Sequence, residues 1–222
     1  MGVDEDQGIN GEIELQHHFG YIIPLQGTLR RIVRNPSFLT HVAHLHNSQD
    51  GILRDDCDGY ITRNHPLFQA FPDSLRIRFY YDDVDVADAV GSHTCNIGAF
   101  YFTLQNLPPK FRSKLDNIFI VAIANRDAIK KFGVELLLAD FRLQMNEFAQ
   151  GIPIQLTPNH EHVFFAFLVG LFGDNPALNF LLGFKESVGP AFRGCRECFG
   201  TINERQFLVC IPPFLPCQKQ IY

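Results

Sequence analysis

The chain contains no tryptophan, has only two methionines among its 222 residues, and lacks a long apolar run. Its longest strongly apolar stretch, Val163 to Phe172, is about half of the roughly 20 residues that a helix needs to cross a bilayer. The first residues, MGVDEDQGINGEIE, are acidic, whereas a signal peptide begins with a basic segment followed by an apolar one. We therefore expect an intracellular chain without a membrane partner.

An excess of positive charge is also missing. The chain has 19 Lys and Arg against 24 Asp and Glu, a net charge of −5. Residues 1–109 carry 7 basic and 14 acidic side chains, a net charge of −7, whereas residues 110–222 carry 12 and 10, a net charge of +2. The affinity of a protein for DNA rises with the number of phosphates that its basic side chains neutralise. A DNA partner would therefore require a local basic stripe or a further part of the protein.

Sequence motifs of several common activities are absent. There is no G-x-S-x-G, H-E-x-x-H, Walker loop or G-x-G-x-x-G, which argues against common hydrolases, zincins and nucleotide-binding folds. The overall composition, with 46% hydrophobic and 19% charged residues, is that of an ordinary globular chain. Function must therefore be sought in local groups of residues.

The cysteines contain one pair with metal-like spacing. All six are Cys57, Cys95, Cys195, Cys198, Cys210 and Cys217. In a chain without secretory features they favour a reduced setting over a disulfide framework. Cys195 and Cys198 form a C-x-x-C pair, which supplies two of the four ligands of a tetrahedral zinc site, and Cys210 and Cys217 are available as the others. The alternative is that the pair consists of two buried free thiols.

The hydrophobic pattern divides the chain into four segments. We expect an acidic, poorly ordered N-terminus at residues 1–20, a helical and loop extension at 21–72, a core at 73–199 and an irregular tail at 200–222. In the extension, apolar residues recur at helical spacing from Tyr21 to Leu45, with a break at Asn35-Pro36. The stretch Asn47 to Pro72, rich in Asp, Asn, Gly and Pro, is typical of a long loop.

Within residues 73–199 the pattern predicts an α/β domain. Period-two or β-rich runs predict strands, and spacings of three and four predict helices. The expected order is strand Leu75–Tyr81, strand Ile97–Leu104, strand Asn117–Ala124, helix Asp127–Gln150, buried strand Val163–Leu171 and helix Ala177–Lys185. This order matches the front of a ribonuclease-H-like domain and is compatible with other α/β layouts.

Two groups of carboxylates follow predicted strands. Asp82, Asp83, Asp85 and Asp88 come after the first strand, and Asp174 comes after the buried one. If these strands lie side by side, acids from both meet at one end of the sheet and can hold Mg²⁺ or Mn²⁺. The alternatives are a solvated acidic loop for the first group and a helix N-cap for Asp174.

Strand parity leaves the first acid undecided. Asp83 shares the apolar face of the first strand, and Asp82 shares the opposite face. The four residues of the apolar face are Leu75, Ile77, Phe79 and Tyr81, and those of the opposite face are Arg76, Arg78 and Tyr80. Both aspartates therefore remain candidates.

Taken together, the motifs of this chain resemble the transposases of eukaryotic cut-and-paste elements, most closely the CACTA type and related transposon-derived proteins. The resemblance extends over about Tyr21 to Phe199. It rests on FYYDD, YFTLQNLPPKFR, NIFIVAIA, FGVELLLADFRLQMNEFAQGI, GDNPALNFLLGF and CREC, in the expected order. Its most specific pieces are Asn106-Leu-Pro-Pro with Arg112, and Gly173-Asp-x-Pro-Ala with Gly183-Phe184.

Members of this group are similar to DDE recombinases, in which three acids on a ribonuclease-H-like core bind two Mg²⁺ or Mn²⁺ ions and cut and join DNA. The resemblance implies that Asp82 or Asp83 is the first acid and Asp174 the second. The third acid would lie beyond the cysteine pair, where Asn203 to Tyr222 no longer follows the family. We therefore expect an incomplete ribonuclease-H-like core that is inactive as this chain, binds DNA only weakly, and is nuclear if it acts on DNA.

Two other hypotheses remain open. One is a domesticated, non-catalytic interaction module built on the same fold. The other is an unrelated α/β protein in which the aspartate clusters are incidental.

Overall fold

The structure is a computed structural model that describes residues 2–7, 13–43, 48, 50–87 and 94–184. The chain divides into two units, residues 1–171 and residues 172–222, which are described separately. In the described part of the chain, no helix is both long enough and apolar enough to cross a membrane.

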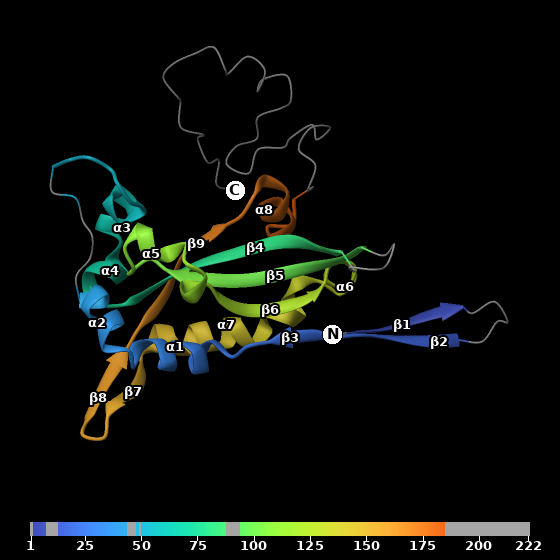
Figure 1. Cartoon of the computed structure of the whole chain (residues 1–222), viewed down its shortest axis with the longest axis horizontal. Helices are drawn as coiled ribbons and strands as arrows, with labels where there is room; N and C mark the ends of the chain where they lie inside the picture. The colour runs from blue at the N-terminus through green and yellow to red at the C-terminus, as the bar shows by residue number, and fades with distance from the viewer. Residues whose placement is uncertain (1, 8–12, 44–47, 49, 88–93, 185–222) are drawn as a thin grey trace, which may run out of the picture. The chain divides into compact units, whose positions relative to one another are not determined.

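A five-stranded sheet forms the centre of the first unit, with its strands in the order β3, β6, β5, β4, β9 (Figure 1). The strands are β3 (Gly20–Ile22), β4 (Leu75–Ala87), β5 (Thr94–Leu104), β6 (Phe119–Asn125) and β9 (Ala166–Phe172). β4, β5 and β6 form an antiparallel meander, and β3 pairs antiparallel with β6 at the edge. The expected mixed α/β class is therefore confirmed.

β9 runs parallel to its neighbour β4. Leu75, the first residue of β4, donates its N–H over 2.8 Å to the carbonyl of Phe165, which directly precedes β9. Adjacent strands that begin at the same end of a sheet run in the same direction. The two strands that the sequence analysis needed side by side are thus adjacent and parallel.

One face of the sheet is buried beneath helices α6 (Arg126–Phe132) and α7 (Val134–Gln150). The ring centroids of Phe79 on β4 and Phe141 on α7 are 4.7 Å apart. Side chains on this face that are at most 2% exposed include Ile77, Phe79, Tyr81, Phe100 and Phe102. Burying a large apolar side chain stabilises a fold by about 1.5–3 kcal/mol, so this layer is the main core of the unit.

The helix expected at Asp127–Gln150 is two helices. Gly133 separates them with φ +83°, a left-handed conformation that glycine adopts without steric strain. Its N–H ends α6 by donating to the carbonyl of Ile129 over 2.9 Å. The apolar spacing continues across the break, which explains why the sequence pattern indicated one helix.

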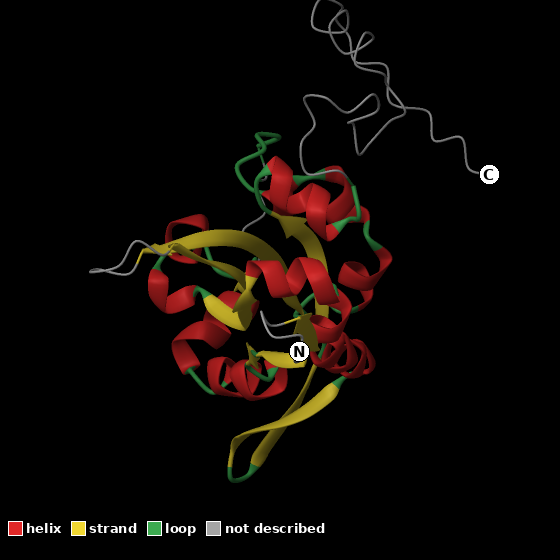
Figure 2. Ribbon diagram, turned by 90° about the vertical axis from the view of Figure 1, so that its right-hand side faces the viewer, coloured by secondary structure: helices red, strands yellow, loops and turns green. Residues whose placement is uncertain are grey.

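The apolar run Val163–Leu171, expected to be one strand, belongs to two. β7 (Ile152–Thr157) and β8 (His160–Phe164) form an antiparallel hairpin, which projects from the first unit in Figure 2. At Phe165 the chain leaves β7 and continues beside β4 as β9. The apolar run is divided because its two halves pair with different strands. The hydrophobic pattern of the sequence does not indicate this change of partner.

The N-terminal segments contain a pair of strands. Residues expected to be poorly ordered include β1 (Gly2–Gln7) and β2 (Ile13–His18), an antiparallel pair in which Val3 lies opposite His17. Ile13-Glu-Leu-Gln has the alternation typical of a strand, and the high acid content obscured it.

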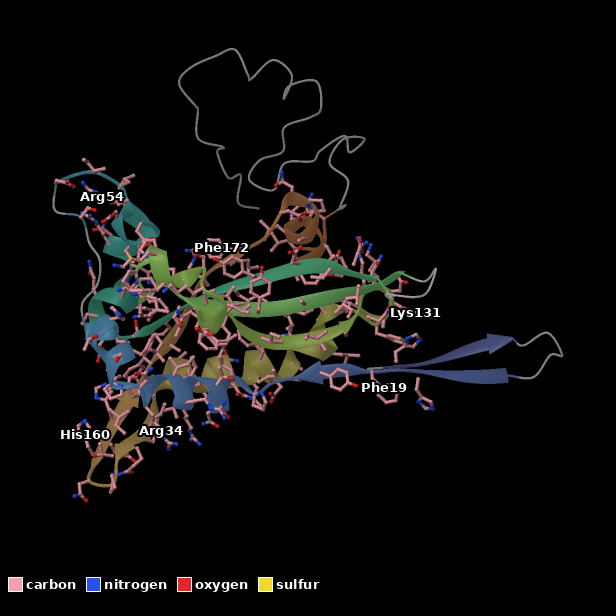
Figure 3. The ribbon with its side chains drawn as sticks, in the orientation of Figure 1. Phe19, Arg34, Arg54, Lys131, His160 and Phe172 are labelled. Atoms are coloured by element: carbon pink, nitrogen blue, oxygen red, sulfur yellow. The ribbon has the colours of Figure 1, made fainter. Side chains whose placement is uncertain are left out.

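The extension contains α1 (Leu25–Val33) and α2 (Pro36–Ala43), as the helical spacing predicted. Leu25, Leu29 and Val33 are at most 1% exposed and form the inner face of α1. Arg34, labelled in Figure 3, follows α1 and donates its Nε to the carbonyl of Gln155 over 3.2 Å. This bond connects the end of α1 to the β7–β8 hairpin.

The stretch expected to be a long loop contains three short helical elements. They are η1 (Asp56–Asp58), α3 (Tyr60–Asn64) and α4 (Pro66–Ala70). The connection between β5 and β6 adds α5 (Pro109–Arg112) and η2 (Leu115–Asn117). In the second unit, α8 (Asn175–Leu181) is the described helix, somewhat earlier than the predicted Ala177–Lys185.

Candidate functional site

The first group of acids lies inside a strand. The sequence analysis ended the first strand at Tyr81, but β4 continues to Ala87. Asp82, Asp83 and Asp85 lie opposite Ala99, Gly98 and Asn96 of β5. The acidic-loop alternative is therefore wrong for these three residues, because backbone pairing fixes their orientation. Asp88 lies outside the described residues.

Asp83 faces the helix-covered side of the sheet and has two close partners. The Tyr81 hydroxyl donates to its Oδ1 over 2.5 Å, and Nε of Arg126, at the start of α6, is 2.8 Å from its Oδ2. The Asp83 and Arg126 side chains are each 28% exposed. A metal ion at Asp83 would have to compete with this arginine for the carboxylate.

Gly98 provides the space for this arrangement. A Cβ atom at this position would lie 3.0 Å from the Tyr81 hydroxyl and 2.5 Å from Cδ1 of Ile129. Since Gly98 is opposite Asp83 in the strand register, its missing side chain leaves room for Tyr81 beside the carboxylate.

Asp82 is on the other face of β4 and is exposed. Beside it, the rings of Tyr80 and Tyr101 stack with centroids 5.1 Å apart and an interplanar angle of 1°. Burial raises the pKa of Tyr101, and the nearby Asp82 carboxylate and Tyr80 raise it further. Of the two candidates for the first acid, Asp82 is the more exposed to a dissolved cation.

Asp174 acts as the N-cap of α8, as one sequence interpretation predicted. Its Oδ1 accepts a hydrogen bond from the backbone N–H of Ala177 over 2.8 Å, and its backbone is extended with φ −69° and ψ 172°. Pro176 occupies the first turn, where the missing proline N–H is harmless. Capping engages one carboxylate oxygen and does not exclude a second role.

The structure brings together no complete metal site in the part of the chain that it describes. No group of three or more His, Cys, Asp or Glu side chains there is placed to hold a metal ion. Cys57 is buried and forms no disulfide with another described residue. The predicted zinc ligands Cys195 and Cys198, with Cys210 and Cys217, lie outside the described residues.

The Asn106-Leu-Pro-Pro motif has a structural role. Asn106 is fully buried, and its Oδ1 accepts from the N–H of Arg76 over 2.8 Å while its Nδ2 donates to the carbonyl of Ser74 over 3.0 Å. The side chain therefore completes the backbone bonding at the start of β4. Asn106 therefore connects the β5–β6 connection to the start of β4, the strand that carries Asp82 and Asp83.

Arg112 of the same motif joins the sheet to the extension. Its guanidinium forms a bidentate ion pair with Asp55, and each side chain is 7% exposed. It also donates to the carbonyls of Leu107 over 2.7 Å and Gln105 over 2.9 Å. The most specific part of the resemblance therefore contains residues that hold the fold together.

Asp58 is a second buried acid that the sequence analysis did not single out. It is 3% exposed and accepts hydrogen bonds from the N–H groups of Ser48 (2.5 Å), Arg54 (2.9 Å) and Asp55 (3.1 Å), and from Arg63 Nη2 (3.0 Å). These bonds, first those from the Ser48 and Arg54 backbone, hold the pKa of the carboxyl far below its usual value. Arg54 is labelled in Figure 3.

Comparison with known proteins does not add a relative. No protein-family model matches the sequence, and a search of curated proteins finds no match. The function is therefore argued from the residues and their geometry.

Proposed function

We propose that the chain is a transposase-related protein with a partial DDE-type core for DNA cleavage and strand transfer, built on a ribonuclease-H-like fold and catalytically incomplete. The observation that carries the proposal is the strand arrangement around β4. An antiparallel meander of β4, β5 and β6 is followed by helices and then by β9, which lies parallel to β4 on its free side. The strand at the centre of this arrangement bears Asp82 and Asp83.

The resemblance assigns Asp174 as the second acid, and we favour Asp82 as the first. Asp82 is exposed, whereas Asp83 is already engaged by Tyr81 and Arg126. Carboxylate oxygens suit Mg²⁺ and Mn²⁺. The described residues nevertheless do not fit a two-metal centre, because no group of three ligands is present among them. We therefore derive no catalytic step and expect only weak binding of a divalent cation.

A non-catalytic interaction module on the same fold is the second candidate. The pairing of Asp83 with Arg126 favours it, because a guanidinium 2.8 Å from the carboxylate occupies the place of a cation. The two candidates differ in one measurable property, which is the affinity of the aspartates for a divalent ion.

The test is a titration of the purified chain with Mn²⁺, in which binding is monitored through the broadening of NMR signals from residues near the metal. We expect weak binding that is lost in Asp82→Asn and in Asp174→Asn. Asparagine caps a helix about as well as aspartate, so Asp174→Asn removes the charge and leaves α8 capped. Asp116→Asn, which neutralises an exposed acid in η2, is the matched control.

A nicking assay on a transposon-end duplex completes the test. We expect no strand cleavage, because two-metal catalysis needs a third acid to hold the second ion. Metal-dependent cleavage that is abolished in Asp174→Asn would refute the proposed incompleteness. Mn²⁺ binding that is equal in all four proteins would exclude the acid site and leave the interaction module.

A further inference from the structure

A pocket of about 550 Å³ lies between α1 and the start of β6 in the first unit. Its volume is within the range of about 300–1,000 Å³ that is typical of small-ligand sites. None of the acids of the proposed function, Asp82, Asp83 and Asp174, lines this α1–β6 pocket. It is therefore a separate candidate site, and its properties do not depend on metal binding or on DNA cleavage by the chain.

The pocket forms because β3 is shorter than the strand with which it pairs. The N–H of Ile23 donates to the carbonyl of Val121 over 2.8 Å, and Pro24, which has no N–H to continue the pairing, then precedes α1 (Figure 1). On the side of β6 away from β5, the described strand register extends from Ala124 to Ala122 and stops there. The preceding residues of β6 therefore border the pocket on this side instead of a neighbouring strand.

Most of the pocket lining is apolar, and part of it is exposed. Six of the nine lining residues are apolar, namely Ile23, Pro24, Ile32, Ile118, Phe119 and Ile120. Ile23 is 44% exposed and Ile120 is 40% exposed, although both are large apolar residues. An apolar ligand that covers them would remove this surface from water, which is favourable. The lining therefore suits a hydrocarbon chain.

Gly27 leaves the α1 side of the pocket open. Apart from the backbone of its own helix, a Cβ atom at this position would meet no described atom within 4 Å, so packing within the chain does not require glycine. Its φ is not positive, so the backbone conformation does not require glycine either. Glycine inside a helix is less favourable than alanine. What Gly27 provides is space for a ligand to lie against the backbone of α1.

Arg31 supplies the pocket with a cation that has no described partner. It is exposed, lies one turn after Gly27 on the same side of α1, and forms no hydrogen bond or ion pair with a described residue. No Asp or Glu lines the pocket, and α1 contains no acidic residue. Arg34, nearly one turn further along, donates to the neutral carbonyl of Gln155, a bond that leaves its positive charge unbalanced. The pocket therefore favours an anionic group, although the whole chain has a net charge of −5.

We infer that the α1–β6 pocket binds a free fatty acid, with its hydrocarbon chain along Ile23, Gly27 and Ile120 and its carboxylate at Arg31. A guanidinium is planar and can donate two parallel hydrogen bonds to one carboxylate, so a single arginine matches a single acid group. A concave apolar surface accepts one chain, whereas attachment to a membrane requires an apolar face that inserts between lipids.

Calorimetric titration of the full chain with decanoate, kept below its micelle concentration, measures this binding. Decyltrimethylammonium has a chain of the same length and the opposite charge, and it should bind about tenfold more weakly or less. The affinity for the carboxylates should rise about fourfold or more for each two-carbon step from octanoate to dodecanoate, because each CH₂ buried in the pocket adds to the binding free energy.

Two substitutions in the pocket separate recognition of the acid group from recognition of the chain. Arg31→Met should weaken decanoate binding about tenfold without weakening the binding of decyltrimethylammonium. Gly27→Leu should fill the pocket and weaken the binding of both probes about tenfold or more. The melting temperature of Gly27→Leu without ligand should stay the same or rise, because leucine is a better helix former than glycine. A lower affinity in a chain that is no less stable cannot result from damage to the fold.

Arg142→Met and Asn146→Leu, at exposed positions of α7, are the matched controls and should not alter affinity. Decanoate binding that is weakened by both pocket substitutions supports the inference. Absence of decanoate binding, equal affinity for the two probes, or equal losses in the pocket and control variants overturns it. Phosphatidylglycerol vesicles are the last probe: binding to vesicles without binding to decanoate would identify a membrane surface as the partner and would also overturn the inference.

Discussion

The buried ion pair between Asp55 and Arg112 leads to a quantitative prediction about the stability of the folded chain. Asp55 comes from the stretch before β4, and Arg112 comes from α5, which is 57 residues later in the chain. Each side chain is 7% exposed, and the guanidinium also bonds to the carbonyls of Gln105 and Leu107. Asp55→Ala would leave a buried positive charge without this carboxylate, and the carbonyls of Gln105 and Leu107 that remain beside it are neutral.

The size of the expected loss of stability follows from the burial of the ion pair. Removing one partner of a buried ion pair costs about 3–5 kcal/mol, because the other charge stays out of water without compensation. For a chain of this size each kcal/mol shifts the melting temperature by about 2–4 °C, so Asp55→Ala should melt roughly 10 °C lower. The double variant Asp55→Leu/Arg112→Met removes both charges and should recover a large part of the loss.

Urea unfolding followed by circular dichroism at constant pH measures these changes. Asp50→Ala is the control, because it breaks the Asp50–Arg54 pair, whose side chains are 50% and 55% exposed, and such pairs contribute little. A loss below about 1 kcal/mol in Asp55→Ala would refute the reasoning. The loss of unfolding free energy in the double variant should be smaller than the sum of the losses in Asp55→Leu and in Arg112→Met. A loss equal to that sum would also refute the reasoning, because the effects of substituting two residues in contact are not additive.

Three further predictions concern the acids and the sheet. Hydrogen bonds hold the pKa of Asp58 below its usual value, so its stabilisation is complete above pH ~4 and is lost as the pH falls below ~4. In urea unfolding, the difference between wild type and Asp58→Asn should shrink over that acid range, and a constant difference would contradict the assignment. Asp82→Asn should lower the pKa of Tyr101 in an ultraviolet tyrosinate titration, with Tyr101→Phe identifying the step, and an unchanged curve would show that the two groups do not interact. Gly98→Ala should destabilise the chain by about 1–3 kcal/mol in denaturant unfolding, because its Cβ would be 2.5 Å from Ile129 Cδ1; unchanged stability would mean that Ile129 moves aside freely.

Much of the sheet was predictable because its strands have a strong period of two. Leu75-Arg-Ile-Arg-Phe-Tyr-Tyr alternates between the helix-covered face and the opposite face, and the structure confirms that Asp83 shares the helix-covered face and Asp82 the opposite one. The length of β4 was not predictable, since aspartates usually mark turns and here continue the strand as far as Ala87.

The polar interior was less predictable, because it depends on contacts between distant segments. Asp55 and Asp58 lie in a stretch whose composition is that of a solvated loop, yet both side chains are buried. The positions of the partner arginines in the sequence do not indicate that these aspartates are buried. The N-cap at Asp174 could be foreseen because capping is local, requiring only Asn175-Pro176 after the aspartate.

The two faces of β4 make this strand sensitive to changes in length. Tyr81 and Asp83 point to the helix-covered side, while Tyr80 and Asp82 point to the open side. Deleting one residue just before Tyr80 would exchange every later side chain between the faces. The Asp82 carboxylate would then be placed under α6 and α7, and the Tyr81 ring would be placed in solvent. Substitutions can therefore alter one face at a time, but insertions and deletions in β4 change both faces at once.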